Sequence, residues 1–62
     1  MPPEPSIDTQ IRIAFETYCQ ESDAFEEKDI KAAAARARKA LGTLAKLAKV
    51  RRGEIQERKN SL

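Results

Sequence analysis

The sequence predicts an all-α fold: a helical hairpin with a short acidic first helix and a long basic second helix, assembled into a dimeric four-helix bundle or a larger oligomer. Three observations lead to this prediction. All three prolines lie within the first five residues, and strong helix formers fill most of the remaining chain. Two stretches carry apolar residues at helical spacing. A chain of 62 residues buries only a modest core, so self-association is expected to complete it.

The composition excludes several other stabilisers and locations. The chain has no His and one Cys, so we expect no metal, no cofactor and no internal disulfide. It has no run of about 18 apolar residues, and we therefore expect no membrane span. The first five residues are acidic and proline-rich, whereas a secretory signal would be basic and then apolar, so a cytoplasmic location is expected.

The net charge of +2 conceals two oppositely charged halves. Residues 1–30 carry two basic residues against eight acids, a net −6, and residues 31–62 carry ten against two, a net +8. This asymmetry indicates that the second half faces a polyanion, that the two halves attract each other, or both.

Residues 1–5 are predicted to form a disordered proline-rich leader, and residues 6–60 to form the helical hairpin domain. Ser6 is a suitable N-cap for a first helix over about residues 7–27, with Asp8 near the positive end of the helix dipole. One arc of about 100° holds the apolar stripe of this helix. The stripe consists of Ile7, Ile11, Ala14, Phe15, Tyr18, Ser22 and Phe25.

The first helix is expected to break near Lys28 and Asp29, where the stripe goes out of phase and the charge reverses. Asp29 is a candidate N-cap for the second helix. Neither Gly nor Pro marks the break, so the sequence leaves a single uninterrupted helix open.

The second helix is expected over about residues 30–59, and its apolar arc of about 160° is wider than one short partner helix covers. The arc consists of Ile30, Ala33, Ala34, Ala37, Ala40, Leu41, Leu44, Ala45, Leu47, Ala48 and Ile55. We therefore expect contact with another copy of the chain, through residues of both helices. The predicted oligomer interface consists of Ile11, Phe15, Tyr18, Leu41, Leu44, Leu47, Ala48 and Ile55.

Folding the chain back at residue 29 predicts the register of the hairpin, with Ile11 near Leu47. The first helix is then too short to cover the end of the second. Arg51 should lie near Asp8 and Glu4 or project beyond the bundle, and the last turns of the second helix should form an arm without a partner in the same chain. Residues 60–62 are expected to fray.

We expect no enzymatic activity and no small-molecule substrate. The sequence has no Ser/His/Asp set and no glycine-rich phosphate loop. Cys19 has no base to activate it, so we interpret it as a half-buried structural thiol.

The basic residues of the second helix form a candidate nucleic-acid site. The candidate residues are Lys31, Arg36, Arg38, Lys39, Lys46, Lys49, Arg51 and Arg52. From Lys31 to Lys49 they span about 27 Å at 1.5 Å per residue, a length suited to the phosphates of a duplex. Lys and Arg also coat ordinary solvent-exposed helices, but such helices mix both signs, whereas no acid occurs between Lys31 and Arg52. The helix has no aromatic residue for base stacking, and a helix lying on an anionic membrane would insert weakly without Trp or Phe.

The runs KAAAARARKAL, from Lys31 to Leu41, and KVRRGEIQERKNS, from Lys49 to Ser61, resemble the helical segment of bacterial linker-histone-like proteins of the chlamydial type. The resemblance extends over about residues 24–61 and is to the short form without a basic Lys/Ala/Pro-rich tail. It implies a nucleoid-associated, DNA-compacting role without enzymatic activity. One departure is the turn, where relatives often have Gly-Asn and this chain has Asp29 and Ile30.

The function predicted from these features is that of a histone-like protein of the bacterial nucleoid, which binds double-stranded DNA with little sequence specificity as a dimer or tetramer and compacts or bridges it. The alternative left open is a small protein-interaction module that docks an acidic partner. Salt distinguishes these two functions. DNA binding should weaken steeply as salt rises, because each phosphate contact contributes about −0.9 to the slope of log affinity against log salt, whereas docking of a partner through the apolar face should hardly respond.

Overall fold

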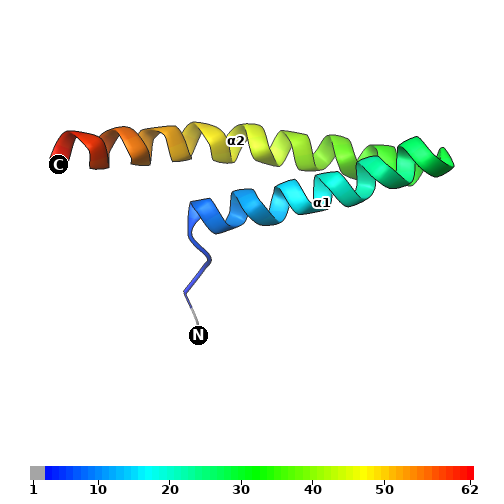
Figure 1. Cartoon of the computed structure of the whole chain (residues 1–62), viewed down its shortest axis with the longest axis horizontal. Coiled ribbons are helices and arrows are strands. Elements are labelled where there is room, and N and C mark those ends of the chain that lie inside the picture. Colours follow the sequence, from blue (N-terminus) through cyan, green and yellow to red (C-terminus); the bar gives the residue numbers. More distant parts are fainter. Residues whose placement is uncertain (1–2) are drawn as a thin grey trace.

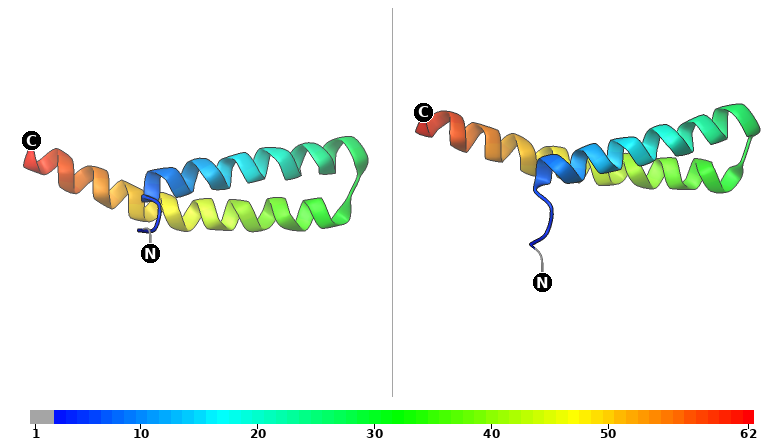
Figure 2. Two further views of the ribbon diagram at one scale, coloured as in Figure 1. Left: turned by 90° about the horizontal axis from the view of Figure 1, so that it is seen from below. Right: turned by 60° about the horizontal axis from the view of Figure 1, so that its bottom comes forward.

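The computed structural model describes residues 3–62, and the described chain forms two helices. α1 (Ile7–Lys28) and α2 (Lys31–Ser61) run antiparallel, joined by residues 29 and 30 (Figure 1). The views in Figure 2 show an elongated hairpin, with extents of 48 × 28 × 13 Å. The predicted all-α hairpin is therefore confirmed. Residues 3–6 are irregular, and the first two residues of the expected leader lie outside the described residues.

The start of α1 is fixed by the predicted N-cap. The Ser6 hydroxyl oxygen accepts a hydrogen bond from the Thr9 backbone N–H at 3.1 Å, and the Ser6 carbonyl accepts from the Gln10 N–H at 2.9 Å. The first bond satisfies a donor that the first turn of a helix otherwise leaves without a partner, and the second is the first backbone bond of the helix itself. Asp8 lies in the same turn and pairs with Arg12 at 3.0 Å.

The turn corrects the prediction for Asp29, which caps the end of α1 rather than the start of α2. Asp29 adopts the left-handed conformation (φ 53°, ψ 36°), and its N–H donates to the Phe25 carbonyl at 2.9 Å. Asp is one of the few residues other than Gly that this conformation tolerates. The N-cap of α2 is Ile30, which offers no side-chain cap and only accepts from the Ala34 N–H at 3.2 Å.

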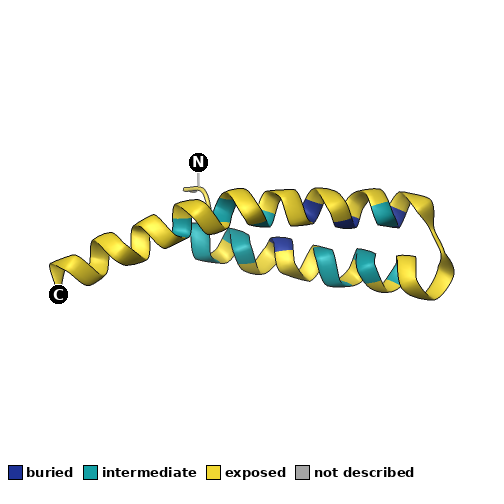
Figure 3. Ribbon diagram, turned by 90° about the horizontal axis from the view of Figure 1, so that it is seen from above, coloured by how far each residue is buried: buried dark blue, intermediate teal, exposed yellow. Residues whose placement is uncertain are grey.

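The contact between the helices is built mainly from alanine. Ala14 of α1 and Ala33, Ala37 and Ala40 of α2 are buried, and they line the facing sides of the two helices in Figure 3. Half-buried residues extend this contact along both helices: Ile7, Ile11, Tyr18, Leu44 and Leu47. Small side chains let two helices approach closely but remove little apolar surface from water. The contact thus fixes the pairing of the helices while larger apolar side chains stay exposed.

Beyond Arg51, α2 has no partner helix, and every residue from Arg52 to Leu62 is exposed (Figures 1 and 3). We call residues 51–61 the arm. Of the two positions expected for Arg51, near Asp8 and Glu4 or beyond the bundle, neither included its observed partner: Arg51 pairs with Glu54, one turn further along α2, at 3.3 Å. The arm stays helical to Ser61, past the expected end near residue 59, and the Ser61 hydroxyl donates to the Glu57 carbonyl at 3.2 Å.

Candidate nucleic-acid interface

The geometry of α2 decides where its basic side chains lie. Successive residues of a helix are rotated by about 100°, so the sequence separation from the buried alanines, which face α1, gives the side of α2 on which each basic residue lies. Lys31, Arg38 and Lys49 lie nearly opposite those alanines, and Lys39 and Lys46 lie beside this line. All five are exposed. The helix therefore presents one continuous basic surface on the side away from α1.

Few of these cations are neutralised within the molecule. Among the described residues the ion pair that joins the helices is Arg36 Nε to Glu21 Oε2, at 2.8 Å. Arg51 is also engaged, by Glu54 of its own helix. The other six candidate residues form no ion pair within residues 3–62: Lys31, Arg38, Lys39, Lys46, Lys49 and Arg52. The acidic first helix therefore leaves most of the basic surface available to an outside anion.

Most acids of α1 do not compete with an outside anion for the basic side chains of α2, because they lie too far from them. Glu16, Asp23 and Glu27 are exposed and lie on the side of α1 that faces away from α2. Only Glu21 is turned toward the basic helix closely enough to form a pair. The hairpin thus carries negative charge on one outer side and positive charge on the other.

The predicted oligomer residues fall into two groups in the structure. Ile11, Tyr18, Leu44 and Leu47 are half-buried along the contact between the helices. The other four are exposed to solvent: Phe15, Leu41, Ala48 and Ile55. Phe15 is 57 % exposed although its ring stacks on Tyr18, with centroids 6.4 Å apart and an interplanar angle of 26°.

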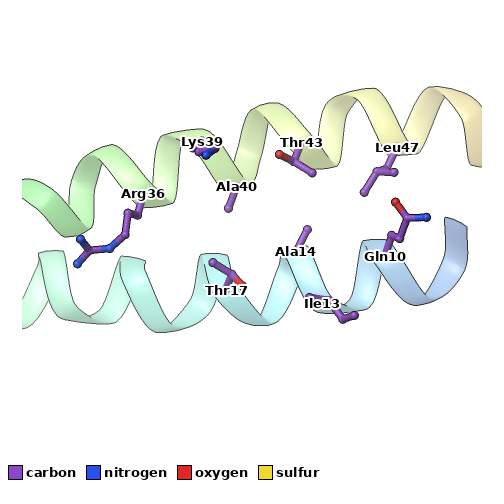
Figure 4. Close-up of a pocket in the computed structure, with 9 residues that line it drawn as sticks. All are labelled: Gln10, Ile13, Ala14, Thr17, Arg36, Lys39, Ala40, Thr43 and Leu47. Carbon is purple, nitrogen blue, oxygen red and sulfur yellow. The ribbon is translucent and has the colours of Figure 1, made fainter. Parts of the chain in front are cut away.

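A groove between the helices was not identified from the sequence. It has a volume of about 450 Å³ and is shown in Figure 4. Its lining residues are Gln10, Ile13, Ala14, Thr17, Arg36, Lys39, Ala40, Thr43 and Leu47. The position of Ile13 off the main stripe of α1 was the one available signal, since an apolar residue there has to contact something else. We call this surface the Thr43 groove.

The described residues show neither a metal-binding cluster nor a membrane-spanning helix. They contain no group of three or more His, Cys, Asp or Glu side chains placed to hold a metal ion. Cys19 is a half-buried free thiol, as expected. Within residues 3–62, neither helix is long and apolar enough to cross a membrane.

An all-α hairpin whose longer helix carries an unneutralised basic surface belongs to the class of small helical proteins with a surface suited to a polyanion. The family model for Histone H1-like protein Hc1 matches residues 9–61, and the chain belongs to this family. The match confirms the resemblance found in the sequence and extends it from residue 24 back through most of α1. Comparisons with curated proteins and with solved structures gave no match. Family membership supports a histone-like, DNA-binding role in general.

Proposed function

We propose that this protein is a nucleoid-associated protein of bacteria that binds duplex DNA through the outer side of α2, with little sequence preference, and compacts or bridges the DNA as a homo-oligomer. The observation that carries the proposal is the set of six exposed cations of α2 that have no ion-pair partner among the described residues, five of which form the continuous surface from Lys31 to Lys49. We propose neither a catalytic step nor a cofactor, and the proposed location is the nucleoid.

The arrangement of these cations favours phosphates over bases. Lys31 and Lys49 mark the ends of a straight row about 27 Å long on a rigid helix, which is a length of several phosphates along a duplex. Binding that relies on phosphate contacts releases condensed counterions and carries no direct sequence information. The proposed binding is therefore strongly salt-dependent and nearly independent of sequence.

The low net charge of one copy makes self-association part of the proposal. With a net charge of +2, a single hairpin gains little from long-range attraction to DNA. Two or more copies joined together bind with a high effective concentration for the second contact. An oligomer also presents more than one basic surface, which bridging of two duplex segments requires.

The test compares two double variants that change the net charge equally. Lys39→Gln with Lys46→Gln removes two unpaired cations of α2, and Arg12→Gln with Lys28→Gln removes both basic residues of α1. Affinity for random-sequence duplex DNA is measured over a range of salt concentrations. We expect the first variant to make the slope of log affinity against log salt less negative by about 1.8, or about 0.9 for each lost phosphate contact, and the second to leave it nearly unchanged.

Equal effects of the two variants would contradict the assignment of DNA binding to α2. Absence of binding to any duplex at low salt would contradict the function itself, and would favour docking of an acidic protein partner. The oligomeric mass and helix content of each variant are measured alongside, so that loss of assembly is not mistaken for loss of phosphate contacts.

A further inference from the structure

The hairpin has two long flanks, one on each side of the plane that contains both helices. The Thr43 groove occupies one flank (Figure 4). At about 100° per residue, a second set of residues lies on the opposite flank of both helices. We call this set the Leu41 flank, and it consists of Ile11, Phe15, Ser22, Ala34, Leu41, Ala45 and Ala48.

The two flanks differ in charge. Arg36 and Lys39 line the Thr43 groove, and Lys46 follows on the same side of α2. On the Leu41 flank, by contrast, the stretch from Ile11 to Ser22 of α1 and from Ala34 to Ala48 of α2 has charged side chains only at its outer edge, namely Arg12 and Arg38. Asp8 and Glu26 lie on the same side just beyond the two ends of that stretch of α1, and Arg52 continues the flank into the arm. A second molecule that covers the Leu41 flank therefore desolvates few charges, whereas one that covers the Thr43 groove desolvates several.

The Leu41 flank also carries two large exposed apolar side chains; the opposite flank carries Ile13 and Val50, which are 54 % and 51 % exposed, so charge rather than exposure separates the two flanks. Phe15 is 57 % exposed and Leu41 49 %. Aromatic side chains supply much of the apolar area that interfaces bury. The hairpin alone buries only alanines completely enough to count as core, so the apolar area that would complete a core is available on this flank.

We propose that a second copy of the chain covers the Leu41 flank, with the turns of both hairpins at the same end and α1 of each copy lying over α2 of the other. This inference rests on the self-association in the proposed function, but not on DNA binding. It names the surface and the orientation of the pair, which together determine where the arms and the basic surfaces lie.

The register of the hairpin makes this pairing self-complementary. The ion pair of Glu21 with Arg36 places these two residues at one level, and on the same antiparallel register Phe15 lies level with Leu41. A twofold axis parallel to the helices keeps every residue at its own level. Phe15 of each copy then contacts Leu41 of the other, and the four side chains form one layer of a four-helix bundle.

Charge selects this orientation over the reversed one. With the turns at the same end, the acidic α1 of one copy lies over the basic α2 of the other, and Glu26 lies level with Lys31 of the second copy. If the second copy is reversed, α2 lies over α2, and Lys31 comes level with Arg52 of the second copy. Like charges at such positions are unfavourable. The net charges of −6 and +8 for the two halves make the same distinction for the whole helices.

Two consequences follow for the assembled pair. Lys39 and Lys46 remain exposed on the outer sides of the bundle, because they lie on the flank away from the second copy. In each copy the arm extends beyond the start of α1 (Figure 2), so both arms leave the bundle at the same end when the two α2 helices run in the same direction. The pair then presents two basic outer surfaces and, at one end, two arms at diagonally opposite corners of the bundle.

The orientation is tested on the full chain with one label per copy. Cys19→Ser removes the native thiol, and Ser61→Cys places a new one at the end of the arm. The label-to-label distance is measured by pulsed electron resonance. We expect roughly 15 to 25 Å, the diagonal of a four-helix bundle with allowance for divergent arms. A distance of about 60 Å, as 1.5 Å per residue gives for the reversed orientation, would overturn it.

The surface is tested by one carboxylate on each flank. Leu41→Glu and Thr43→Glu both lie on exposed positions of α2 and change the net charge equally. We expect Leu41→Glu to raise the dissociation constant of the oligomer by more than about tenfold, because the symmetric pair buries two carboxylates. Thr43→Glu should leave the constant within about threefold. The opposite result would place the second copy on the Thr43 groove and overturn the inference.

These outcomes are separable from those for DNA binding. A chain that is monomeric at all accessible concentrations but still binds duplex DNA would overturn the pairing and leave DNA binding intact. A stable pair with the expected label distance that ignores DNA would do the reverse. Far-UV circular dichroism of the Leu41→Glu variant shows whether it is still helical, so that unfolding is not scored as dissociation.

Discussion

The two parts of α2 are helical for different reasons. From Lys31 to Val50 the helix lies against α1, and its side facing α1 includes the buried Ala33, Ala37 and Ala40. From Arg51 to Ser61 the arm has no partner helix, and all of its residues after Arg51 are exposed. The arm is held only by contacts within itself, such as the side-chain bond from Gln56 Nε2 to Asn60 Oδ1 at 3.1 Å.

This comparison shows that one continuous helix draws on two sources of stability. A helix as short as the arm is marginal in water when isolated, because nucleation is unfavourable. Here the paired part supplies the nucleus, and the arm only extends it. The paired part should therefore unfold together with α1, whereas the arm should open locally and at lower free energy. Five of the six cations without an ion-pair partner lie on the part of α2 that packs against α1. Most of the candidate DNA surface is therefore on the more stable part of the helix.

The largest expected effect comes from breaking the contact between the helices. Ala33 is fully buried, and Ala35 two residues away is exposed on the same turn. Replacing Ala33 by Glu places a carboxylate where there is neither space nor a partner. We expect a loss of about 3 kcal/mol or more in the free energy of unfolding, which is enough to unfold so small a hairpin.

Ala35→Glu is the matched control, since it makes the same chemical change in the same helix and is expected to cost less than about 0.5 kcal/mol. Both are followed by circular dichroism during urea unfolding, at one protein concentration because assembly also affects stability. Similar losses in the two variants would mean that the alanine contact does not hold the paired part together.

The fold could be predicted from the sequence because it depends on signals that act locally. The spacing of apolar residues identifies both helices, and Ser6 identifies the start of α1. The ion pair of Arg51 with Glu54 was also available, as an i,i+3 pair within one helix. The sequence interpretation placed Arg51 either near Asp8 and Glu4 or beyond the bundle, and it did not include the acid one turn further along the same helix.

The rest depends on how closely and at what rotation the two helices meet. A stripe shows that Phe15 and Ala14 lie on related sides of α1, but not that only Ala14 becomes buried. The Thr43 groove and the pair of Glu21 with Arg36 exist only at one particular register. Asp29 was assigned to the wrong helix because Asp suits both an N-cap and a left-handed C-cap, and the sequence does not distinguish these roles.

The two glycines of α2 test the difference between the paired part and the arm more directly, although the expected effect is smaller. Gly42 lies in the paired part and Gly53 in the arm, and a Cβ added at either would meet no atom within 4 Å. Replacing either by Ala therefore brings the benefit in helix propensity without a clash, about 1 kcal/mol. For Gly42→Ala we expect this gain in the global free energy of unfolding, measured in urea.

For Gly53→Ala the same gain should appear only within the arm. We expect slower amide hydrogen exchange over residues 51–61 and an unchanged global midpoint, because the arm unfolds before the hairpin. A global gain equal to that of Gly42→Ala would show that the arm unfolds together with the paired part, and would remove the distinction between them.

The smallest expected effect concerns the turn, which belongs to the paired part alone. Asp29 holds a left-handed conformation at φ 53°, where Gly is favoured. Asp29→Gly should relieve that conformational cost but also increase the entropy of the unfolded chain, so we expect a net gain of only about 0.5 kcal/mol. Asp29→Ala, which keeps a Cβ and loses the polar side chain, should instead cost about 1 kcal/mol.

Amide exchange in the arm should be the same in both variants, since the arm has no contact with the turn. If exchange in the arm followed the global stability of these variants, its opening would be the global unfolding of the hairpin rather than a separate local event.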